Sequence, residues 1–201
     1  MLRIGITGGL GSGKTTAARF FGDRSARVFD ADMEAKLILL RHEPVRQAIV
    51  EAFGEVVLNE VGEIDFGRLA AYAFAEPERQ QRLNDIIHPE VVLAAERAMT
   101  AASLQGVSLF VIDVPLLFEA HLERYLDYTL VVVADEELRI KRALERGTIT
   151  EEDIRSRIRL QLSDEQRAAQ ADFVVQNNGT LGELFQQLEE IYDTLNRILQ
   201  S

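Results

Sequence analysis

The chain has 201 residues, 47% of them hydrophobic and 27% charged, with a formal net charge of −11 and no cysteine. This profile indicates a soluble globular protein with one substantial core, and it argues against several independent domains, disulfides, thiolate chemistry and broad nucleic-acid binding. No apolar run approaches the roughly 20 residues that cross a bilayer, and the start shows neither a basic leader nor a cleavage site, so we expect a cytoplasmic protein without membrane association.

The first predicted element is an apolar strand, residues 2–7, which leads into a glycine-rich loop and then a helix. The loop sequence Gly8-Gly9-Leu10-Gly11-Ser12-Gly13-Lys14-Thr15 is a complete match to the phosphate-binding pattern G-x-x-x-x-G-K-[ST] in the context that the pattern requires. Its glycines leave backbone N–H groups open to an anion, and the helix N-terminus adds positive charge. We expect Lys14 to reach the β- and γ-phosphates and Thr15 to hold magnesium. The predicted triphosphate ligands are Gly8, Gly9, Gly11, Ser12, Gly13, Lys14, Thr15 and Thr16.

A second strand is predicted at residues 26–29, followed by Asp30-Ala31-Asp32. In open α/β sheets, ligands collect at the carboxyl ends of strands, so these aspartates are expected at the same edge as the phosphate-binding loop. One of them would then act as a base. Aspartate is also a favoured N-cap for the helix predicted from Met33, and position alone does not separate the two interpretations.

Residues 33–105 form a predicted helical insertion with almost no strands, suited to binding an acceptor. Helices are expected from Met33 to Gly54, with a second one starting at Pro44, then at residues 66–75 behind the N-cap Asp65, and at residues 76–104. Pro89 predicts a kink or break in the last of these. The neighbouring His88 would contact a phosphate or a ribose, but a lone histidine beside a kink is more often a packing or capping residue, and we favour that interpretation.

A third, buried strand is predicted at residues 107–112, closed by Asp113. A carboxylate at the end of such a strand, beside a phosphate-binding loop, is the usual second anchor of a magnesium shell. The alternative role of Asp113 is to cap the next short helix.

After a fourth strand at residues 130–133, a helix is predicted at residues 136–146 and another from residue 151, with seven Lys and Arg residues between positions 139 and 159. A charge-rich helical pair is usually a solvated surface. Arg142 and Arg146, however, are four residues apart and share one face, which suits a mobile arm that closes over phosphates. We prefer this interpretation for the pair.

The last strand is predicted at residues 172–175, followed by the turn Gln176-Asn177-Asn178-Gly179 and an amphipathic helix at residues 181–199. Asn177 or Asn178 would touch a nucleotide base, although Asn-Gly is also simply good turn chemistry. Five strands that alternate with helices predict an α/β fold, a P-loop NTPase-type parallel sheet flanked by helices. No guanine-reading Asn-Lys-x-Asp segment occurs, whereas a carboxylate, an acceptor lobe and cationic groups match a kinase for a small acceptor.

Five segments together resemble the dephospho-coenzyme A kinase family of the nucleoside monophosphate kinase-like group. They are Ile4-Gly5-Ile6-Thr7-Gly8-Gly9-Leu10-Gly11-Ser12-Gly13-Lys14, Phe29-Asp30-Ala31-Asp32, Ile87-His88-Pro89, Asp113-Val114-Pro115-Leu116-Leu117-Phe118-Glu119, and Ala171-Asp172 with Asn177-Asn178-Gly179. The resemblance implies transfer of the ATP γ-phosphoryl to the 3′-hydroxyl of dephospho-coenzyme A, the last step of coenzyme A synthesis. It also implies a nucleotide-binding core (1–32, 106–134 and 168–201), a helical coenzyme A-binding domain (33–105) and a helical lid (135–167).

The resemblance further implies a role for each matching residue. Asp32 would be the catalytic base, Lys14 would neutralise the transferring phosphate, and Arg142 on the lid would stabilise the transition state with Arg146 as its helper. Asn177 joins the expected ATP ligands, and Asp32, Lys36 and His88 are expected on the acceptor side, with magnesium held by Thr15 and Asp113.

Two departures from the family pattern qualify these roles. Where the family often has Ala-Arg, this chain has Ala35-Lys36, and a lysine replaces a bidentate arginine only as a point charge. Gly147 follows Arg146 where the family often has Asp. The alternative functions are another small-acceptor kinase, for a nucleoside or a nucleoside monophosphate, and a nucleotide-dependent binding module. The residues carry no signal for the oligomeric state.

Overall fold

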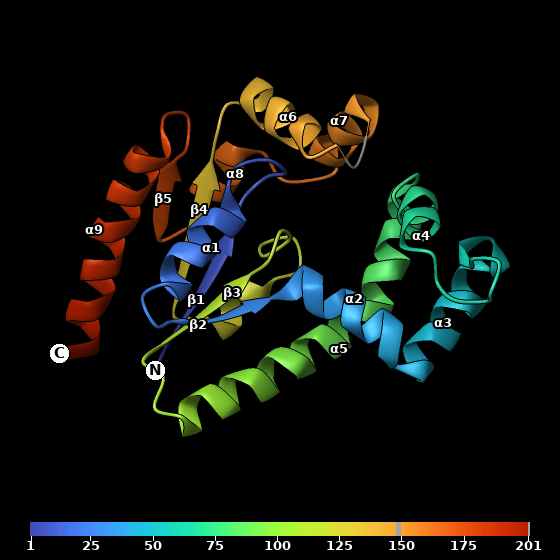
Figure 1. Ribbon diagram of the computed structural model, residues 1–201, viewed down its shortest axis with the longest axis horizontal. Helices are drawn as coiled ribbons and strands as arrows, with labels where there is room; N and C mark the ends of the chain where they lie inside the picture. The colour runs from blue at the N-terminus through green and yellow to red at the C-terminus, as the bar shows by residue number, and fades with distance from the viewer. Residues whose placement is uncertain (148–149, 201) are drawn as a thin grey trace. The chain divides into compact units, whose positions relative to one another are not determined.

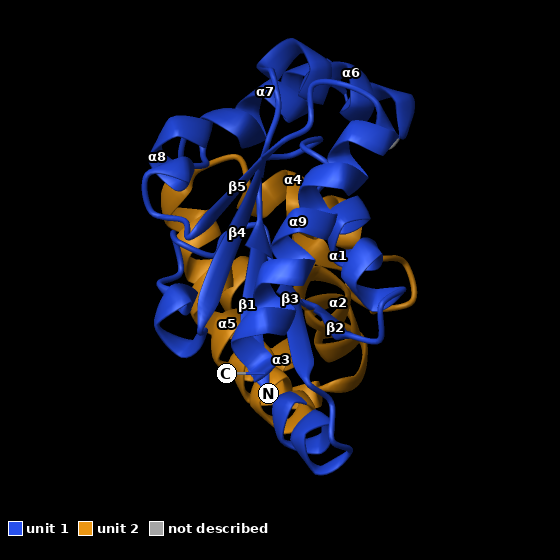
Figure 2. Ribbon diagram, turned by 90° about the vertical axis from the view of Figure 1, so that its left-hand side faces the viewer, with its two compact units in different colours: residues 1–30, 99–201 blue, residues 31–98 orange. Residues whose placement is uncertain are grey.

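A computed structural model describes residues 1–147 and 150–200 of the chain. The chain divides into two compact units (Figure 2), one made of residues 1–30 with 99–201 and the other of residues 31–98. The second unit thus covers most of the predicted helical insertion, and the predicted lid at residues 135–167 belongs to the first unit. Residues 148–149 of that lid and Ser201 of the predicted core lie outside the described residues.

The first unit is built around a five-stranded parallel sheet with helices packed against it (Figure 1). All four strand pairs are parallel, and the strand order is β2-β3-β1-β4-β5. The strands are β1 (Leu2–Thr7), β2 (Arg27–Asp30), β3 (Leu109–Asp113), β4 (Tyr128–Val133) and β5 (Phe173–Gln176). The predicted fold class is confirmed, because all five expected strands form and each is separated from the next by helices.

The register of the strands brings the chemically important residues to one edge of the sheet. Ile6 on β1 and Asp30 on β2 are both aligned with Asp113 on β3. Since all strands run in the same direction, the glycine-rich loop after β1 and the carboxylate of Asp113 lie at the same carboxyl edge.

The three central strands, β1, β3 and β4, are buried on both faces over most of their length, as is typical of a parallel sheet. Helices α1 (Lys14–Gly22) and α9 (Leu181–Gln200) contribute to one core cluster with alternate residues of the strands. Leu184, Leu188 and Leu195 of α9 are fully buried at helical spacing, and each such side chain contributes about 1.5–3 kcal/mol. On the other face, Gly5 leaves no room for a methyl group because Leu117 and Leu126 cover β1 at that point.

Between β4 and β5, the described part of the chain forms three helices that belong to the first unit. They are α6 (Glu136–Glu145), α7 (Glu151–Arg159) and α8 (Asp164–Ala168), with the short 3-10 helix η2 (Leu122–Tyr125) before β4. Ile140, Ala143 and Ile154 join α6 to α7 in a small core against which Leu10 packs. Helix α8 was not predicted, although Ser163 and Gln166 form a capping box at its start, which is a recognisable sequence signal.

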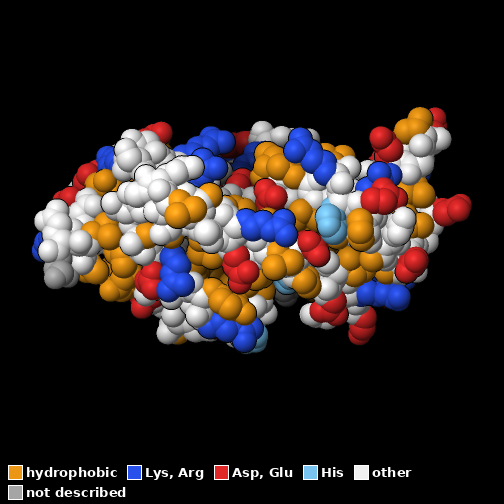
Figure 3. Space-filling view, turned by 90° about the horizontal axis from the view of Figure 1, so that it is seen from below, with side chains coloured by type: hydrophobic (Ala, Val, Ile, Leu, Met, Phe, Trp, Pro, Cys, Tyr) orange, Lys and Arg blue, Asp and Glu red, His pale blue; other side chains and the backbone are white. Residues whose placement is uncertain are grey.

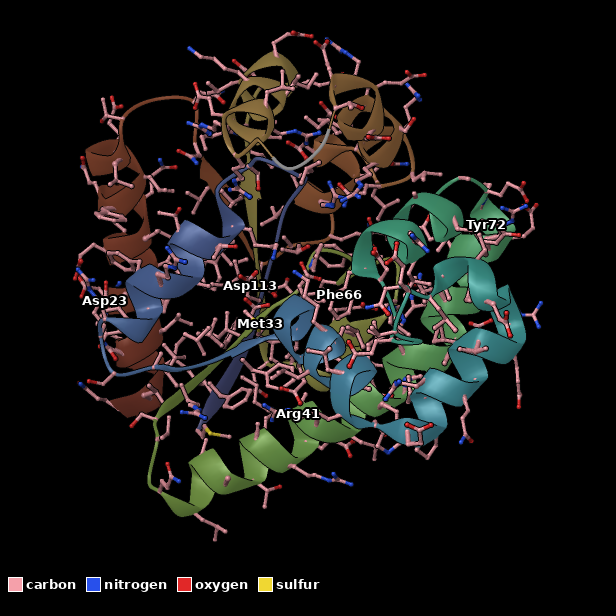
Figure 4. All side chains as sticks on the ribbon, turned by 45° about the vertical axis from the view of Figure 1, so that its right-hand side comes forward. Asp23, Met33, Arg41, Phe66, Tyr72 and Asp113 are labelled. Carbon is pink, nitrogen blue, oxygen red and sulfur yellow. The ribbon has the colours of Figure 1, made fainter. Side chains whose placement is uncertain are left out.

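The second unit is helical and has its own hydrophobic core. Its elements are α2 (Ala31–Arg41), α3 (Glu43–Phe53), η1 (Glu55–Val57), α4 (Phe66–Ala73) and α5 (Pro77–Leu104), the last turns of which belong to the first unit. Figure 4 labels Met33 in the first turn of α2, Arg41 as its last residue and Phe66 at the start of α4. The predicted N-cap is confirmed, because the Asp65 carboxylate accepts a hydrogen bond from the Arg68 backbone N–H at 2.9 Å.

Of the predicted kink or break at Pro89, the break is wrong, because α5 is one continuous helix of 28 residues with Pro89 inside it, whereas the kink stays a prediction. A proline in a helix interior costs about 3 kcal/mol because it removes a hydrogen bond. Leu83 and Ile87 before Pro89, and Ala95 after it, are at least nine-tenths buried. Burial of a large apolar side chain contributes about 1.5–3 kcal/mol of stability. The buried residues around Pro89 therefore offset the cost of the proline.

Strand β3 begins at Leu109, two residues later than predicted. Gly106 adopts a left-handed φ of 72° after the end of α5, and the Val107 N–H donates back to the Ala102 carbonyl at 3.1 Å. This closing turn satisfies a free carbonyl of the helix, so Val107 belongs to the helix end and not to the strand.

Candidate active site

The loop between β1 and α1 has the backbone that phosphate binding requires. Gly11 and Gly13 adopt left-handed φ angles of 81° and 103°, which strain any residue with a side chain. The loop closes with a hydrogen bond from the Ser12 N–H to the Gly9 carbonyl at 3.0 Å. The Leu10 N–H donates to the Gln161 Oε1 at 3.4 Å. Because the glycines carry no side chains, a phosphate can approach the other backbone N–H groups of the loop closely.

Helix α1 begins directly at the loop, with Gly13 at its N-cap position. Among the described residues, no side chain caps this N-terminus and its first turn contains no acid. The first N–H groups of a helix have no partner within the helix and carry partial positive charge, so this end favours an anion. Lys14, Thr15 and Thr16 form this first turn and are partly exposed.

Lys14 and Asp113 form an ion pair in the structure: the Lys14 Nζ donates to the Asp113 Oδ1. Asp113 is the last residue of β3 (Figure 4) and its side chain is only 2% exposed, whereas that of Lys14 is 13% exposed. The segment after Asp113 stays close to β1, since the Val114 N–H donates to the Ile6 carbonyl at 3.0 Å. The structure therefore brings together the two residues that the sequence assigned to the phosphate and to the metal.

Asn177 and Arg142 close the loop from another direction. The Asn177 Nδ2 donates to the Ser12 carbonyl at 2.6 Å, and the Asn177 backbone carbonyl accepts a hydrogen bond from the Arg142 Nη1 at 2.9 Å. A methyl group at Gly13 would collide with the Asn177 amide. Asn177 thus positions the loop with its amide, and a contact of Asn177 with a base stays a prediction. Arg146, at the C-cap of α6, is exposed.

Asp32 and Lys36 both lie on α2 in the second unit. The helix begins at Ala31, two residues earlier than predicted, so Asp32 is inside the first turn and does not occupy the N-cap position. Asp32 and Lys36 are both exposed and, four residues apart, share one face of the helix. This arrangement removes the capping interpretation for Asp32 and leaves its carboxylate on the surface of the unit.

His88 is half-buried in α5. Burial lowers the pKa of His88 below its usual value, an effect that the negative charge of Asp85 only partly opposes. The neutral imidazole is thereby favoured, which supports packing over a charged phosphate contact. Its predicted place on the acceptor side is not tested by this geometry.

The lowered pKa of His88 predicts an acid-dependent loss of stability. The unfolded chain takes up a proton near the ordinary histidine pKa of about 6.5, whereas the folded chain resists it. The stability contributed by neutral His88 is therefore present above that pH and is lost as the pH falls through the lowered pKa of the folded state. We expect the melting temperature of His88→Gln to fall less between pH 7.5 and pH 5 than that of the unmodified protein. The exposed His121, changed to Gln, is the control, and an unaltered pH profile for His88→Gln would contradict the prediction.

A pocket of about 440 Å³ opens at the carboxyl ends of β4 and β5, but its charge does not suit a phosphate. Its lining includes Asp135, Glu136, Asp164 and Glu165, whereas Arg139, the one cation among the described lining residues, is paired with Asp164 at 2.7 Å. Four acids against one neutralised arginine disfavour an anionic ligand. The glycine-rich loop is accordingly the better site for the phosphates.

The surface and the helices add two observations on possible partners. On the face drawn in Figure 3, the Lys and Arg side chains of the described residues are interspersed with Asp and Glu instead of forming one basic surface. Within residues 1–147 and 150–200, no helix combines the length and the apolar character that a bilayer crossing needs.

Comparison with known protein families decides which group of P-loop proteins this is. The model of the dephospho-CoA kinase family matches residues 2–183 of the chain. The chain belongs to the dephospho-CoA kinase family. The resemblance seen in the sequence is confirmed, and with it the expectation of an ATP-dependent kinase.

Relatives of known name and structure agree with membership of the dephospho-CoA kinase family. A dephospho-CoA kinase of Salinibacter ruber is 43% identical over 96% of this chain and 96% of its own length. One from Corynebacterium glutamicum is 40% identical over 98% of this chain and its full length. A crystal structure of a Thermus thermophilus protein superimposes with a TM-score of 0.76 at 32% identity, covering 96% of this chain and 97% of the other.

Beyond the residues expected for the dephospho-CoA kinase family, the structure contains a buried ionic network that sequence reasoning missed. It joins α6, α8 and the segment after β3, and its members are Arg139, Asp164, Arg167 and Glu119. Glu119 ends one of the family-like segments and the Ser163–Gln166 capping box marks α8, but neither signal indicates that these four side chains meet.

Proposed function

We propose that this protein transfers the γ-phosphoryl group of ATP to the 3′-hydroxyl of dephospho-coenzyme A, giving coenzyme A and ADP in the last step of coenzyme A synthesis. The observation that carries the kinase chemistry is the open glycine-rich loop with Lys14 and Asp113 paired beside it. The choice of acceptor is supported by membership of the dephospho-CoA kinase family over nearly the whole chain. The absence of cysteine is compatible with the cytoplasmic location that we propose.

The nucleotide is bound in this proposal by the loop and by α6. The N–H groups of the loop and of the first turn of α1 bind the phosphate oxygens, and Lys14 leaves Asp113 to neutralise the transferring phosphoryl group. Arg142 and Arg146 extend from α6 and its C-cap and add positive charge as a lid over the triphosphate. Asn177, which holds the Ser12 carbonyl, borders the site of the nucleoside.

The residues at the loop fit a magnesium ion. Thr15 offers a hydroxyl and Asp113 a carboxylate, both hard oxygen donors, and Mg²⁺ in kinases needs only one or two protein ligands besides phosphate and water. Within the described residues there is no cluster of three or more His, Cys, Asp or Glu side chains that would hold a metal without a substrate. An ion held by Thr15 and Asp113 would supply positive charge against the negative charge that develops on the transferring phosphoryl group.

The chemical step uses Asp32 as the base. Its carboxylate accepts the proton of the acceptor 3′-hydroxyl while that oxygen forms its bond to the γ-phosphorus and the bond to the β,γ-bridging oxygen breaks. Asp32 lies two residues after Asp30, which ends β2 at the edge that also carries Asp113. Lys36, one helical turn after Asp32, supplies a point charge for an acceptor phosphate, and His88 is assigned to the same acceptor side.

The experiment that tests the function measures ADP formation from ATP and magnesium with and without dephospho-coenzyme A. A panel of nucleosides and nucleoside monophosphates is run in parallel. We expect stimulation by dephospho-coenzyme A alone and a product phosphorylated at the 3′-oxygen. Turnover with a nucleoside or monophosphate instead would point to a different small-acceptor kinase, and ATP hydrolysis that no acceptor stimulates would point to a binding module.

The role of Asp113 predicts a changed metal requirement in Asp113→Asn. The amide keeps the shape of the side chain but loses the negative charge, so the free Mg²⁺ concentration for half-maximal rate should rise by about 10–100-fold. The measurement is the initial rate against free Mg²⁺ at saturating ATP. Asp30→Asn, its register neighbour on β2, is the matched control. An unchanged Mg²⁺ dependence in Asp113→Asn would remove Asp113 from the metal site.

A further inference from the structure

The buried guanidinium of Arg139 lies directly against the phosphate-binding loop. The three atoms nearest to a methyl group placed on Gly9 all belong to this guanidinium, with the Arg139 Cζ at 2.7 Å. Gly9, unlike Gly11 and Gly13, has no left-handed φ, so its backbone conformation would accept an alanine. What excludes a side chain at position 9 in this fold is therefore Arg139.

Arg139 also contacts the loop through its backbone. A methyl group on Gly11 would collide with the Arg139 carbonyl oxygen and would lie 2.8 Å from the carbonyl carbon. The residue between the two glycines, Leu10, packs against Ile140 and Ala143 of the same helix. The loop from Gly9 to Gly11 thus rests on one turn of α6 by main-chain and side-chain contacts.

The far end of the Arg139 side chain is held by the buried ionic network. The Arg139 Nη1 donates to the Asp164 Oδ1 at 2.7 Å, and the same oxygen accepts a hydrogen bond from the Arg167 Nη1 at 3.3 Å. The Arg167 Nη2 in turn donates to the Glu119 Oε1 at 3.1 Å. The side chains of Arg139 and Arg167 are 6% and 1% exposed, and those of Asp164 and Glu119 are 17% and 19% exposed.

The network has two consequences for the position of Arg139. Two arginines balance two carboxylates, so the cluster is neutral as a whole, which a buried group of charges requires. Asp164 lies in the first turn of α8 and Glu119 in the segment that follows β3, so the carboxylates of the network that holds Arg139 come from elements outside the loop and outside α6. Its guanidinium is therefore fixed independently of any ligand in the loop.

We propose that Arg139, held in place by Asp164, is a positioning residue that sets the backbone of Gly9–Gly11 for the phosphates of ATP. This inference rests on the proposed use of the loop as the ATP site. Arg139 acts without touching the nucleotide: its Nη1 donates to Asp164, and its guanidinium packs against Gly9. Backbone N–H donors that are already in position need no rearrangement when the phosphate binds. This preorganisation is the reason why they bind the phosphate strongly. Since α6 also carries Arg142, the same contact ties the loop to the predicted lid helix.

The test is a double-mutant cycle between positions 9 and 139, read by direct binding of ATP to the whole protein. Gly9→Ala should weaken ATP binding by about tenfold or more, because the new methyl group meets the fixed guanidinium. Arg139→Ala should also weaken it. The double variant should bind ATP at least as tightly as the single variant with the lower ATP affinity. The effects of the two substitutions on ATP affinity would then depart from additivity by about tenfold. The KM for ATP should rise in the single variants while the KM for the acceptor is unchanged.

Arg167→Met is the matched control, because Arg167 belongs to the same buried network but is not among the atoms nearest to any loop glycine. We expect it to lower the melting temperature and to combine additively with Gly9→Ala in ATP binding. If Arg139→Ala does not fold, Arg139→Lys takes its place in the cycle, since lysine keeps the charge beside Asp164 and lacks the atoms that crowd Gly9. Arg139→Lys alone should retain more ATP affinity than Arg139→Ala.

The outcomes separate this proposal from the proposed function. If the unmodified protein binds no ATP, the proposed function is wrong and the positioning role is overturned with it. If the unmodified protein binds ATP but Gly9 and Arg139 variants combine additively, or if Arg139 and Arg167 variants change only the melting temperature and to the same degree, Arg139 is merely structural and the positioning role is overturned.

Discussion

Replacing Asp32 by Asn is expected to lower kcat by a factor of about 10²–10⁴ while leaving ATP affinity nearly unchanged. The amide has the same shape as the carboxylate but cannot accept the proton of the attacking hydroxyl. Asp32 is exposed in the first turn of α2, and in our proposal it acts on the acceptor hydroxyl and is not a ligand of the triphosphate, so its replacement should not disturb nucleotide binding. The loss should therefore appear in kcat and in kcat/KM alike.

The measurement for Asp32→Asn is steady-state turnover with dephospho-coenzyme A together with an independent ATP titration. Glu34→Gln is the matched control, because Glu34 is the other acid in the first turn of α2. Both substitutions remove a negative charge near a helix N-terminus, which costs about 0.3–1 kcal/mol of stability. A difference in kcat between the two variants therefore measures the catalytic effect of losing the Asp32 carboxylate. Equal turnover by Asp32→Asn and the unmodified protein would show that Asp32 is not the catalytic base.

The second large effect is expected for Lys14→Ala, which should reduce kcat/KM by about 10²–10³ or more with the fold retained. The lysine would supply the one full positive charge of the loop, and loss of a single well-placed donor to a developing charge has effects of this size. Removal of Lys14 also leaves the 2%-exposed carboxylate of Asp113 without its cation. A loss of stability of about 1–3 kcal/mol should accompany the loss of activity.

A second variant separates these two losses. Lys14→Ala combined with Asp113→Asn removes both members of the ion pair, so it should recover much of the lost melting temperature and none of the activity. The melting temperature and turnover of the single and double variants are measured side by side. A fully active Lys14→Ala protein would mean that this loop is not the triphosphate site.

Much of the fold was predictable because its signals are local. The buried strand at residues 130–133 is a continuous apolar run, and Asp65 caps α4 through a hydrogen bond to a residue three positions away. The phosphate-binding loop spans eight consecutive residues, and its glycines, lysine and threonine are dictated by backbone conformation and charge within that stretch. Such features need no knowledge of the rest of the chain.

The errors arose where tertiary packing outweighed a local rule. Pro89 is a helix breaker by itself, yet α5 continues through it because buried residues on both sides hold the helix. Helix α8 is only five residues long, too short to show a hydrophobic period, and Ser163 with Gln166 was its one sequence signal. Burial likewise lowers the pKa of His88 and favours its neutral form, and the sequence does not show that this side chain is buried.

The sequence by itself determined the chemistry available to this protein. Short segments and their spacing carry the phosphate-binding loop, the order of the motifs along the chain and the membership of the dephospho-CoA kinase family. Only the tertiary structure decided which side chains meet. Lys14 and Asp113 are 99 positions apart, Ser12 and Asn177 are 165 apart, and Arg139 and Asp164 are 25 apart. The physical reason is that a local conformation is set by neighbouring residues, whereas a contact across such separations exists only after the sheet and its helices have packed.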